Sequence, residues 1–383
     1  MYKYYNEKPL RPAWIEIDLG QLQRNFEIIN NDKPGDLRIL AVVKDQAYGH
    51  GAVQVARTAI ENGAVYLAVA TIDEALDLRQ NGITAPILLF GERTEAELKV
   101  CVENNFTCTI NDVSTVARTS RLAAAAGQSM PVHVEVDTGL NRFGVRWTEA
   151  LPVLEAIAAT NELILEGVFS HFAMSDEVDK SFALEQLRRF QEVLTEMAAR
   201  GIRTKYRHMC NTGGYLDLPL AHFDMVRIGI LPLGVYPSQV CRRVAGLQPV
   251  MAVKTKIAAI KDVQVGDTVG YGMHYRAETP RRIAVLPIGY GDGYPRVRNQ
   301  GEVLVGGQRA PVVGGNAMDA MMVDITNIPE SRLWDEAVLL GKQGDEEITV
   351  HDLARLRKTV SYDILTGWSP RLPRVYLTES KEP

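Results

Sequence analysis

The chain has 383 residues, a length that favours two domains, one of them large. Hydrophobic residues make up 46% and charged residues 23%, as in ordinary globular enzymes, and a net charge of −5 gives no reason to expect nucleic acid or an anionic membrane as a partner. No apolar run approaches the ~20 residues that span a bilayer, and residues 1–11 lack the apolar region of a signal peptide. We therefore expect the protein to stay in the cytoplasm.

The first predicted elements are a strand over residues 13–17 and a helix that Asp18 can cap. The apolar stripe of this helix is formed by Leu19, Leu22, Phe26 and Ile29. From residue 39 onward, short apolar runs alternate with longer segments that have helical periodicity, such as 72–81 and 182–200. The apolar runs predict strands over residues 39–43, 65–71, 86–90, 106–110, 132–136, 165–170, 206–209 and 223–228.

About eight strands alternating with helices are typical of an α/β fold, the (β/α)₈ barrel of TIM type. We assign the barrel to residues 12–248. From residue 249 valine, glycine and threonine become more frequent and helical periodicity fades. This texture predicts a mostly β domain over residues 249–383, with which residues 1–17 are expected to pair, and strands over 251–260, 282–287, 302–305 and 310–313.

The four cysteines have neither paired nor regular spacing, and they are interpreted as buried free thiols: Cys101, Cys108, Cys210 and Cys241. The histidines include no HExxH pair. We therefore expect no metal site.

Chemistry in barrels of this type takes place at the C-terminal ends of the strands, where this chain has Lys44, Asp137, His171, Asn211, Thr212 and Arg227. A lysine at the mouth of an apolar barrel is partly desolvated, which lowers its pKa and makes it a usable amine. Any one of these residues alone could be an ordinary polar loop residue. Together they favour an anionic cofactor and an amine nucleophile.

The segment from Ala41 to Gly51 reads AVVKDQAYGHG and resembles the VKxxAYGHG motif that holds pyridoxal 5′-phosphate (PLP) in the alanine racemase family. The resemblance extends from about residue 12 to residue 376. It implies a PLP-binding barrel, a β-rich C-terminal domain and a homodimer with shared active sites, in which Lys44 forms a Schiff base with PLP. Further matching segments carry Arg142 (DTGLNRFG), His171 (SHFA), Arg227 (VRIGI), Tyr271 (GYG), Tyr290 (IGYGDG), Met318 with Asp319, and Tyr362 (SYD).

The resemblance implies that L- and D-alanine are interconverted by two bases on opposite faces of the substrate. Lys44 would serve one face and the partner subunit's Tyr271 the other. His171 would bond this tyrosine, and Arg227 would polarise His171. Arg227 would also keep the pyridine nitrogen of PLP unprotonated, because arginine does not release its proton.

The same resemblance implies a set of cofactor contacts. The backbone N–H groups of Gly229 and Ile230 would bind the phosphate. Side-chain contacts would come from Tyr48, Asn211, Thr212 and Tyr362. Alternative interpretations are that Tyr48 is an aromatic lid residue and that Tyr362 is a packing residue of the second domain.

Three positions depart from the best-known form of the family. Glu135 stands where that form has a carbamylated lysine, and strand alternation turns it into the barrel, so we expect it to pair with Arg142. Ala317 replaces a familiar cysteine, and Pro370 stands where some members have a tyrosine. A racemase that acts also or mainly on serine or another amino acid therefore stays open, unless a residue such as Asn316 refills the space.

Two other functions remain as alternatives. A PLP-dependent decarboxylase on the same barrel would face the pyridine nitrogen with a carboxylate, where this chain has Arg227. A non-catalytic PLP-binding protein would be a lone barrel, without the extra ~130 residues that carry Tyr271 and Asp319. Alanine racemisation, which supplies D-alanine for cell-wall synthesis, is the favoured function.

Overall fold

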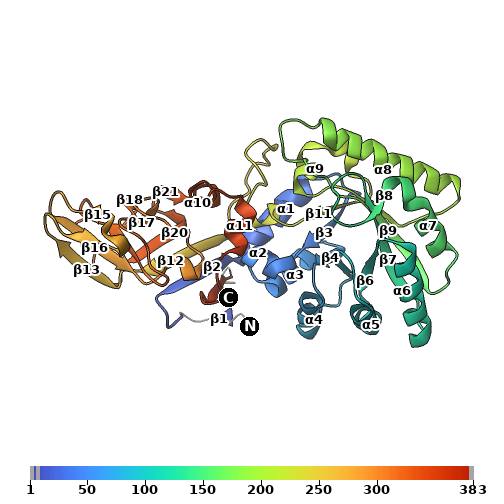
Figure 1. Ribbon diagram of the computed structural model, residues 1–383, viewed down its shortest axis with the longest axis horizontal. Coiled ribbons are helices and arrows are strands. Elements are labelled where there is room, and N and C mark those ends of the chain that lie inside the picture. Colours follow the sequence, from blue (N-terminus) through green and yellow to red (C-terminus); the bar gives the residue numbers. More distant parts are fainter. Residues whose placement is uncertain (1–3, 6–8, 379–383) are drawn as a thin grey trace, which may run out of the picture.

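The computed structural model describes residues 4–5 and 9–378, which form a helix-covered barrel at one end and a β-rich domain at the other (Figure 1). The described residues do not include 1–3, 6–8 and 379–383. The predicted pairing of residues 1–17 and the predicted second domain therefore fall partly outside them. No helix in the described part of the chain is long and apolar enough to cross a membrane.

Eight parallel strands form the barrel and confirm the predicted (β/α)₈ architecture. In sheet order they are β11 (Met225–Ile228), β3 (Arg38–Val42), β4 (Tyr66–Val69), β5 (Ile87–Leu89), β6 (Thr107–Ile110), β7 (Met130–Asp137), β9 (Leu163–Phe169) and β10 (Tyr206–His208). Backbone hydrogen bonds from Asp224 N to Arg207 O (3.1 Å) and from Arg227 N to Cys210 O (2.9 Å) join the two remaining edges, β10 and β11. All eight C-terminal ends therefore meet at one mouth.

Helices cover the outside of the barrel (Figure 1). Those that follow strands are α3 (Ala52–Glu61), α4 (Ile72–Gln80), α5 (Glu95–Glu103), α6 (Val113–Ala126), α7 (Ala150–Ala158), α8 (Ser181–Ala199) and α9 (Thr212–Asp217). After β11 the chain forms only a 3₁₀ turn, η3 (Leu231–Leu233). Helix α1 (Leu19–Asp32), which Asp18 caps as predicted, packs against this turn and against α3.

The second domain is built on a mixed sheet that includes both ends of the described chain. Its order is β1 (Tyr4–Tyr5), β22 (Arg374–Leu377), β2 (Ala13–Asp18), β12 (Met251–Lys256), β20 (Glu336–Gln343), β17 (Glu302–Val305) and β18 (Gln308–Pro311), with β21 (Glu346–Ile348) paired to β20. A smaller sheet contains β13 (Ala259–Val263), β16 (Arg281–Leu286) and β19 (Met321–Asp324), and β14 (Thr268–Val269) pairs with β15 (Tyr275–Arg276).

Two expectations for this domain are wrong in detail. The single strand predicted over 251–260 is two strands, β12 and β13, in different sheets. Ile257 N bonds Asp335 O while Ala258 N bonds Val285 O, so the chain changes sheets between these two residues. The domain also contains two helices that fading periodicity concealed, α10 (Val350–Arg357) and α11 (Ser361–Thr366).

Candidate active site

A cavity of about 630 Å³ opens at the C-terminal mouth of the barrel. Residues from the barrel strands and their following loops form its wall, and Tyr362 of α11 closes it from the second domain. The structure thereby brings together most of the predicted site residues: Lys44, Tyr48, Glu135, Arg142, His171, Asn211, Thr212, Arg227, Gly229, Ile230 and Tyr362.

Lys44 begins α2 (Lys44–Gly49), whose next four residues form a left-handed turn. From Asp45 to Tyr48, φ lies between 50° and 54° and ψ between 42° and 54°. Four non-glycine residues in this conformation are costly, at about 1–2 kcal/mol each. Glu74 Oε1 accepts a hydrogen bond from Asp45 N (2.5 Å), and Val43 O accepts one from Ala47 N (2.9 Å). One local bond and one bond to Glu74 of the neighbouring helix α4 therefore hold the turn that follows Lys44.

Gly49 and His50 complete this turn. Gly49 has φ 81°, and a Cβ there would lie 2.4 Å from Leu365 O, so the second domain leaves no room for a side chain. His50 is fully buried and its Nδ1–H donates to Tyr48 O (3.0 Å) and Ala47 O (3.2 Å). Burial lowers the pKa of His50 to about 4, so this ring is neutral at ordinary pH.

The Lys44 amine is half-buried, and desolvation lowers its pKa, as the sequence predicts. The positive charges of Arg142 and, more weakly, Arg227 act in the same direction, while Glu74 and Asp45 oppose them. A lysine with a depressed pKa has a larger unprotonated fraction near neutral pH. Such an amine can act as a nucleophile or a base.

Arg227 is buried at the end of β11 and donates hydrogen bonds to several groups. Its Nη2 donates to His171 Nδ1 (2.9 Å), and its Nη1 donates to His208 Nδ1 (3.0 Å). Three carbonyl oxygens, those of Ser170, His208 and Met209, accept further bonds. Desolvation lowers the pKa of Arg227 only to about 10, so the guanidinium stays charged near neutral pH.

These bonds determine the tautomers of half-buried His171 and of two buried histidines, His208 and His133. Because Arg227 occupies Nδ1 of His171, neutral His171 carries its proton on Nε2. His208 likewise carries its proton on Nε2 and donates it to His133 Nδ1 (3.0 Å). Burial, together with the charge of Arg227, lowers the pKa of each histidine. The sequence reading missed His208 and gave His133 no role, although each lies on a barrel strand.

Another part of the cavity wall is formed by two tyrosines and by the residues that follow β11. Tyr48 and Tyr362 have ring centroids 5.8 Å apart, and burial raises the pKa of both phenols. A Cβ on Gly229 would lie 2.5 Å from Tyr48 Oη. The backbone N–H groups of Gly229 and Ile230 have no acceptor among the described residues. Phenols that stay protonated and free N–H groups are donors suited to an anion.

Asn211 and Thr212 mark the start of α9. Asn211 Oδ1 accepts bonds from Gly214 N (2.9 Å) and Ser175 Oγ (2.7 Å), which fixes the loop after β10. Thr212 is buried and also lines the cavity. Both predicted cofactor contacts therefore lie in the wall, and Asn211 at the same time caps the helix.

The expected ion pair between Glu135 and Arg142 is wrong for this structure. Glu135 is buried in the cavity wall as predicted, but no cation in the described part of the chain lies within ion-pair distance of it. Asp137 Oδ1 accepts bonds from Gly139 N and Asn141 N and turns the loop so that Arg142 is exposed. Desolvation raises the pKa of Glu135, and the charge of Arg227 opposes this more than that of Arg142 does.

The remaining predicted site residues belong to the second domain. Tyr271 begins a turn, η4 (Tyr271–Met273), and is 75% exposed, while Met318 is 55% exposed. Asp319 is exposed, and Tyr290 begins η5 (Tyr290–Asp292). None of these side chains lines the barrel cavity within one chain.

Close backbone packing joins the segments that carry these exposed residues. Tyr290 N donates to Ala317 O (3.1 Å), and Gly291 N donates to Met318 O (2.7 Å). A Cβ on Gly289 would lie 2.2 Å from Ala317 O, so glycine is required at this approach. A Cβ on Gly270, next to Tyr271, would lie 2.8 Å from Gly315 N, so the turn of Tyr271 packs against the same segment. We call the surface formed by Tyr271, Tyr290 and Met318 the Tyr271 surface.

Comparisons with known proteins cover both domains. Residues 17–237 match the family model "Alanine racemase, N-terminal domain", and residues 250–376 match "Alanine racemase, C-terminal domain". "Alanine racemase 2" of Caldanaerobacter subterraneus subsp. tengcongensis is 40% identical over 370 residues, which are 96% of this chain and 95% of that protein.

Solved structures agree with this assignment. Alanine racemase from Bacillus anthracis with bound L-Ala-P superposes with a TM-score of 0.90 at 37% identity, over 98% of this chain and 97% of that one. Histidine racemase from Leuconostoc mesenteroides subsp. sake superposes with a TM-score of 0.88 at 29% identity, over 97% of this chain and all of that one. The chain therefore belongs to the alanine racemase family.

Proposed function

We propose that this protein interconverts L- and D-alanine with PLP bound through Lys44, and that it does so as a homodimer. One observation carries the proposal: a lysine of lowered pKa shares a cavity with a buried arginine, charged near neutral pH, and a wall of anion donors. The division into a cofactor barrel over 12–248 and a β-rich domain over 249–383 is part of the proposal.

The residues at the barrel mouth fit PLP. Its phosphate would be held by the free N–H groups of Gly229 and Ile230 and by the hydroxyls of Tyr48 and Tyr362, which have no hydrogen-bond partner among the described residues. Arg227, which lines the cavity from the end of β11, would face the pyridine nitrogen. When bound, PLP supplies the electron sink that makes the α-proton of an amino acid removable.

The residues of this chain then supply the proton transfers. Lys44 Nζ is a base on one face of the substrate, because its lowered pKa frees the lone pair. The opposite face needs a second base, which we assign to Tyr271 of the partner subunit. His171 presents Nε2–H to that phenol and stabilises its deprotonated form, since Arg227 occupies Nδ1.

The homodimer follows from the separation of the site into two parts. Lys44 lies in the barrel cavity, whereas the Tyr271 surface lies on the other domain and is open to solvent. A second copy that covers the barrel mouth with its own Tyr271 surface would complete one site, and the reciprocal contact would complete the other.

A complementation experiment tests the shared site. Lys44→Ala and Tyr271→Ala should each abolish racemisation, measured by chiral chromatography of alanine. After the two variants are mixed, unfolded and refolded together, hybrid dimers hold one intact site, so about a quarter of the parent activity should return. No recovery, with mixed dimers present, would contradict the shared site.

A broader substrate range is the second candidate. Ala317 stands where the family resemblance implies a cysteine, and the exposed Pro370 stands where some members have a tyrosine. Both positions are expected near the substrate. A relative of the same fold is a histidine racemase by name. A chiral assay across alanine, serine, lysine and arginine, with carbon dioxide measured in parallel, separates a strict racemase, a broad racemase and a decarboxylase.

A further inference from the structure

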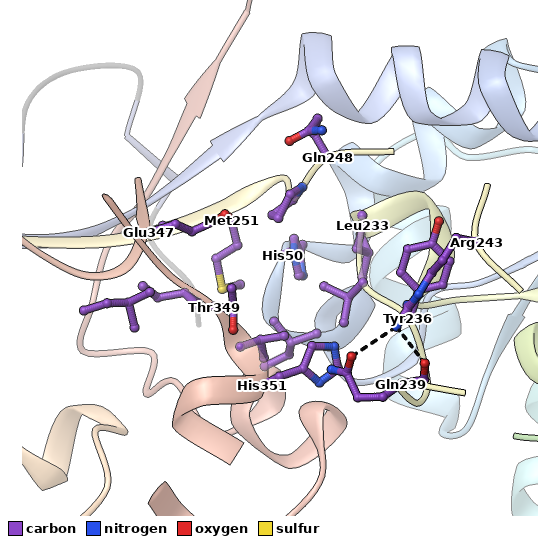
Figure 2. A pocket seen from close by; sticks show the side chains of 18 residues that line it. His50, Leu233, Tyr236, Gln239, Arg243, Gln248, Met251, Glu347, Thr349 and His351 are labelled. Atoms are coloured by element: carbon purple, nitrogen blue, oxygen red, sulfur yellow. Dashed lines mark hydrogen bonds between the residues drawn. The ribbon is translucent and has the colours of Figure 1, made fainter. Parts of the chain in front are cut away.

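A second cavity, of about 300 Å³, lies where the barrel meets the second domain (Figure 2). The barrel contributes His50, the η3 turn and the loop from Tyr236 to Gln248, while the second domain contributes β12, β20, β21 and the start of α10. Its inner wall also contains His50 but is otherwise largely apolar, with Leu233, Val235, Met251, Leu340, Ile348, Val350 and Leu365. It shares no lining residue with the cavity at the barrel mouth.

One polar atom in this wall lacks a partner. His50 is fully buried, and its Nδ1–H is already bonded to the carbonyls of the left-handed turn. Its Nε2 has no hydrogen-bond partner among the described residues. With the proton on Nδ1, Nε2 is an acceptor, and a buried acceptor without a donor costs about 1–3 kcal/mol. The cavity would therefore favour an occupant that brings a hydroxyl or N–H donor.

The rim carries a positive charge that the protein does not neutralise. The guanidinium carbon of Arg243 lies 4.1 Å from the centroid of the Tyr236 ring. Arg243 also donates hydrogen bonds to Gln239 O (3.1 Å) and Gln239 Oε1 (3.2 Å), which are the dashed lines in Figure 2. Within residues 9–378 it has no carboxylate within 4.0 Å, whereas the rim carboxylate of Glu347 has Lys342 nearby. Desolvation by burial, and after it the charge of Arg243, lowers the pKa of His351 on the same rim.

We infer that this interdomain cavity binds a small amphipathic carboxylate that carries a hydroxyl or N–H donor at its apolar end. The carboxylate meets the guanidinium of Arg243, which neighbouring groups hold in place. The apolar body is enclosed by leucine, valine and methionine side chains from both domains. The donor satisfies His50 Nε2, the acceptor on the ring that also supports the turn after Lys44.

Three probes separate these contributions: 4-hydroxyphenylacetate has all three features, phenylacetate lacks the hydroxyl, and 4-hydroxyphenylethanol lacks the carboxylate. Binding to the full chain is measured by titration calorimetry in excess alanine, which competes for any amino-acid site at the barrel mouth. We expect 4-hydroxyphenylacetate to bind with a Kd about tenfold or more below those of the two truncated probes.

Variants of adjacent arginines provide the matched control. Arg243→Gln should weaken binding of 4-hydroxyphenylacetate about tenfold and leave that of 4-hydroxyphenylethanol unchanged. Arg242→Gln should change neither, because Arg242 faces away and pairs with Asp32 (2.8 Å). Equal affinities for the three probes, loss of binding in excess alanine, or an unaffected Arg243→Gln variant would each overturn the inference. Because binding is measured directly, an absence of racemase activity would not affect this result.

Discussion

Replacement of Gly229 by alanine tests whether the Tyr48 wall holds the cofactor. The backbone of Gly229 lies outside the left-handed region, so alanine is tolerated there and only the added methyl group matters. That Cβ would lie 2.5 Å from Tyr48 Oη and 2.7 Å from Cε2, closer than real contacts allow. Tyr48 is buried against Tyr362, so relief requires both rings to move.

Overpacking of this kind costs about 1–3 kcal/mol, which corresponds to cofactor binding weakened roughly 5- to 150-fold. The assay is titration of cofactor-free protein with PLP, followed by the absorbance of the lysine-bound cofactor. Gly35→Ala is the control, because a Cβ at Gly35 meets nothing within 4 Å. A Gly229→Ala variant that loses thermal stability but keeps the parent affinity for PLP would refute the assignment of Tyr48 to the cofactor.

Three further predictions concern the second base, the buried Glu135 and the substrate pocket. Tyr271→Phe should slow α-proton exchange in heavy water much more for L-alanine than for D-alanine, and equal slowing would contradict two bases. Burial raises the pKa of Glu135 above 4.5, so its ionisation destabilises the fold increasingly as pH rises through the folded pKa. Glu135→Gln should therefore be more stable than the parent at pH 8 and lose this advantage below about pH 4.5, and a pH-independent difference would show that charge burial is not the cause. If Ala317 and Pro370 leave room, serine should be racemised within ~1–3 kcal/mol of alanine in activation free energy, and strict alanine specificity by chiral assay would rule this out.

Asn316 is poorly placed to refill that space. Its Oδ1 accepts a bond from Val297 N (3.0 Å), and its Nδ2 donates to Pro295 O (2.9 Å). The side chain is buried and committed to the loop that precedes β17. A change of specificity would therefore have to come from other residues around Ala317.

The barrel and most of its mouth could be predicted from the sequence because the signals are local. Alternation of strands and helices determines the architecture, and a residue at a strand end is placed at the mouth by that architecture alone. Lys44 and Arg227 are of this kind. Strand alternation correctly predicts that Glu135 points into the barrel. Its predicted pairing with Arg142 is wrong because it depends on the direction of a loop, which Asp137 sets by accepting two backbone hydrogen bonds.

Other features were not readable because they arise from contacts between distant segments. In the sequence Asp45-Gln-Ala-Tyr48 only the aspartate is of a type that adopts left-handed backbone readily, and four such residues in a row are not expected. Helix α10 carries a readable signal at its N-terminus, since Thr349 and Asp352 form a capping box. The role of His208 appears only when Arg227 and His133 are seen on either side of it.

The position of β2 has a consequence for synthesis of the chain. This strand precedes the whole barrel, yet it lies inside the sheet of the second domain, between β12 and β22. Its neighbours leave the ribosome only after more than two hundred residues have followed, and β22 is near the very end. Residues 13–18 must therefore wait unpaired while the barrel folds, and such non-local pairing is slow to form. The last strand to emerge secures one of the first, so a truncated chain would be left with an open sheet edge.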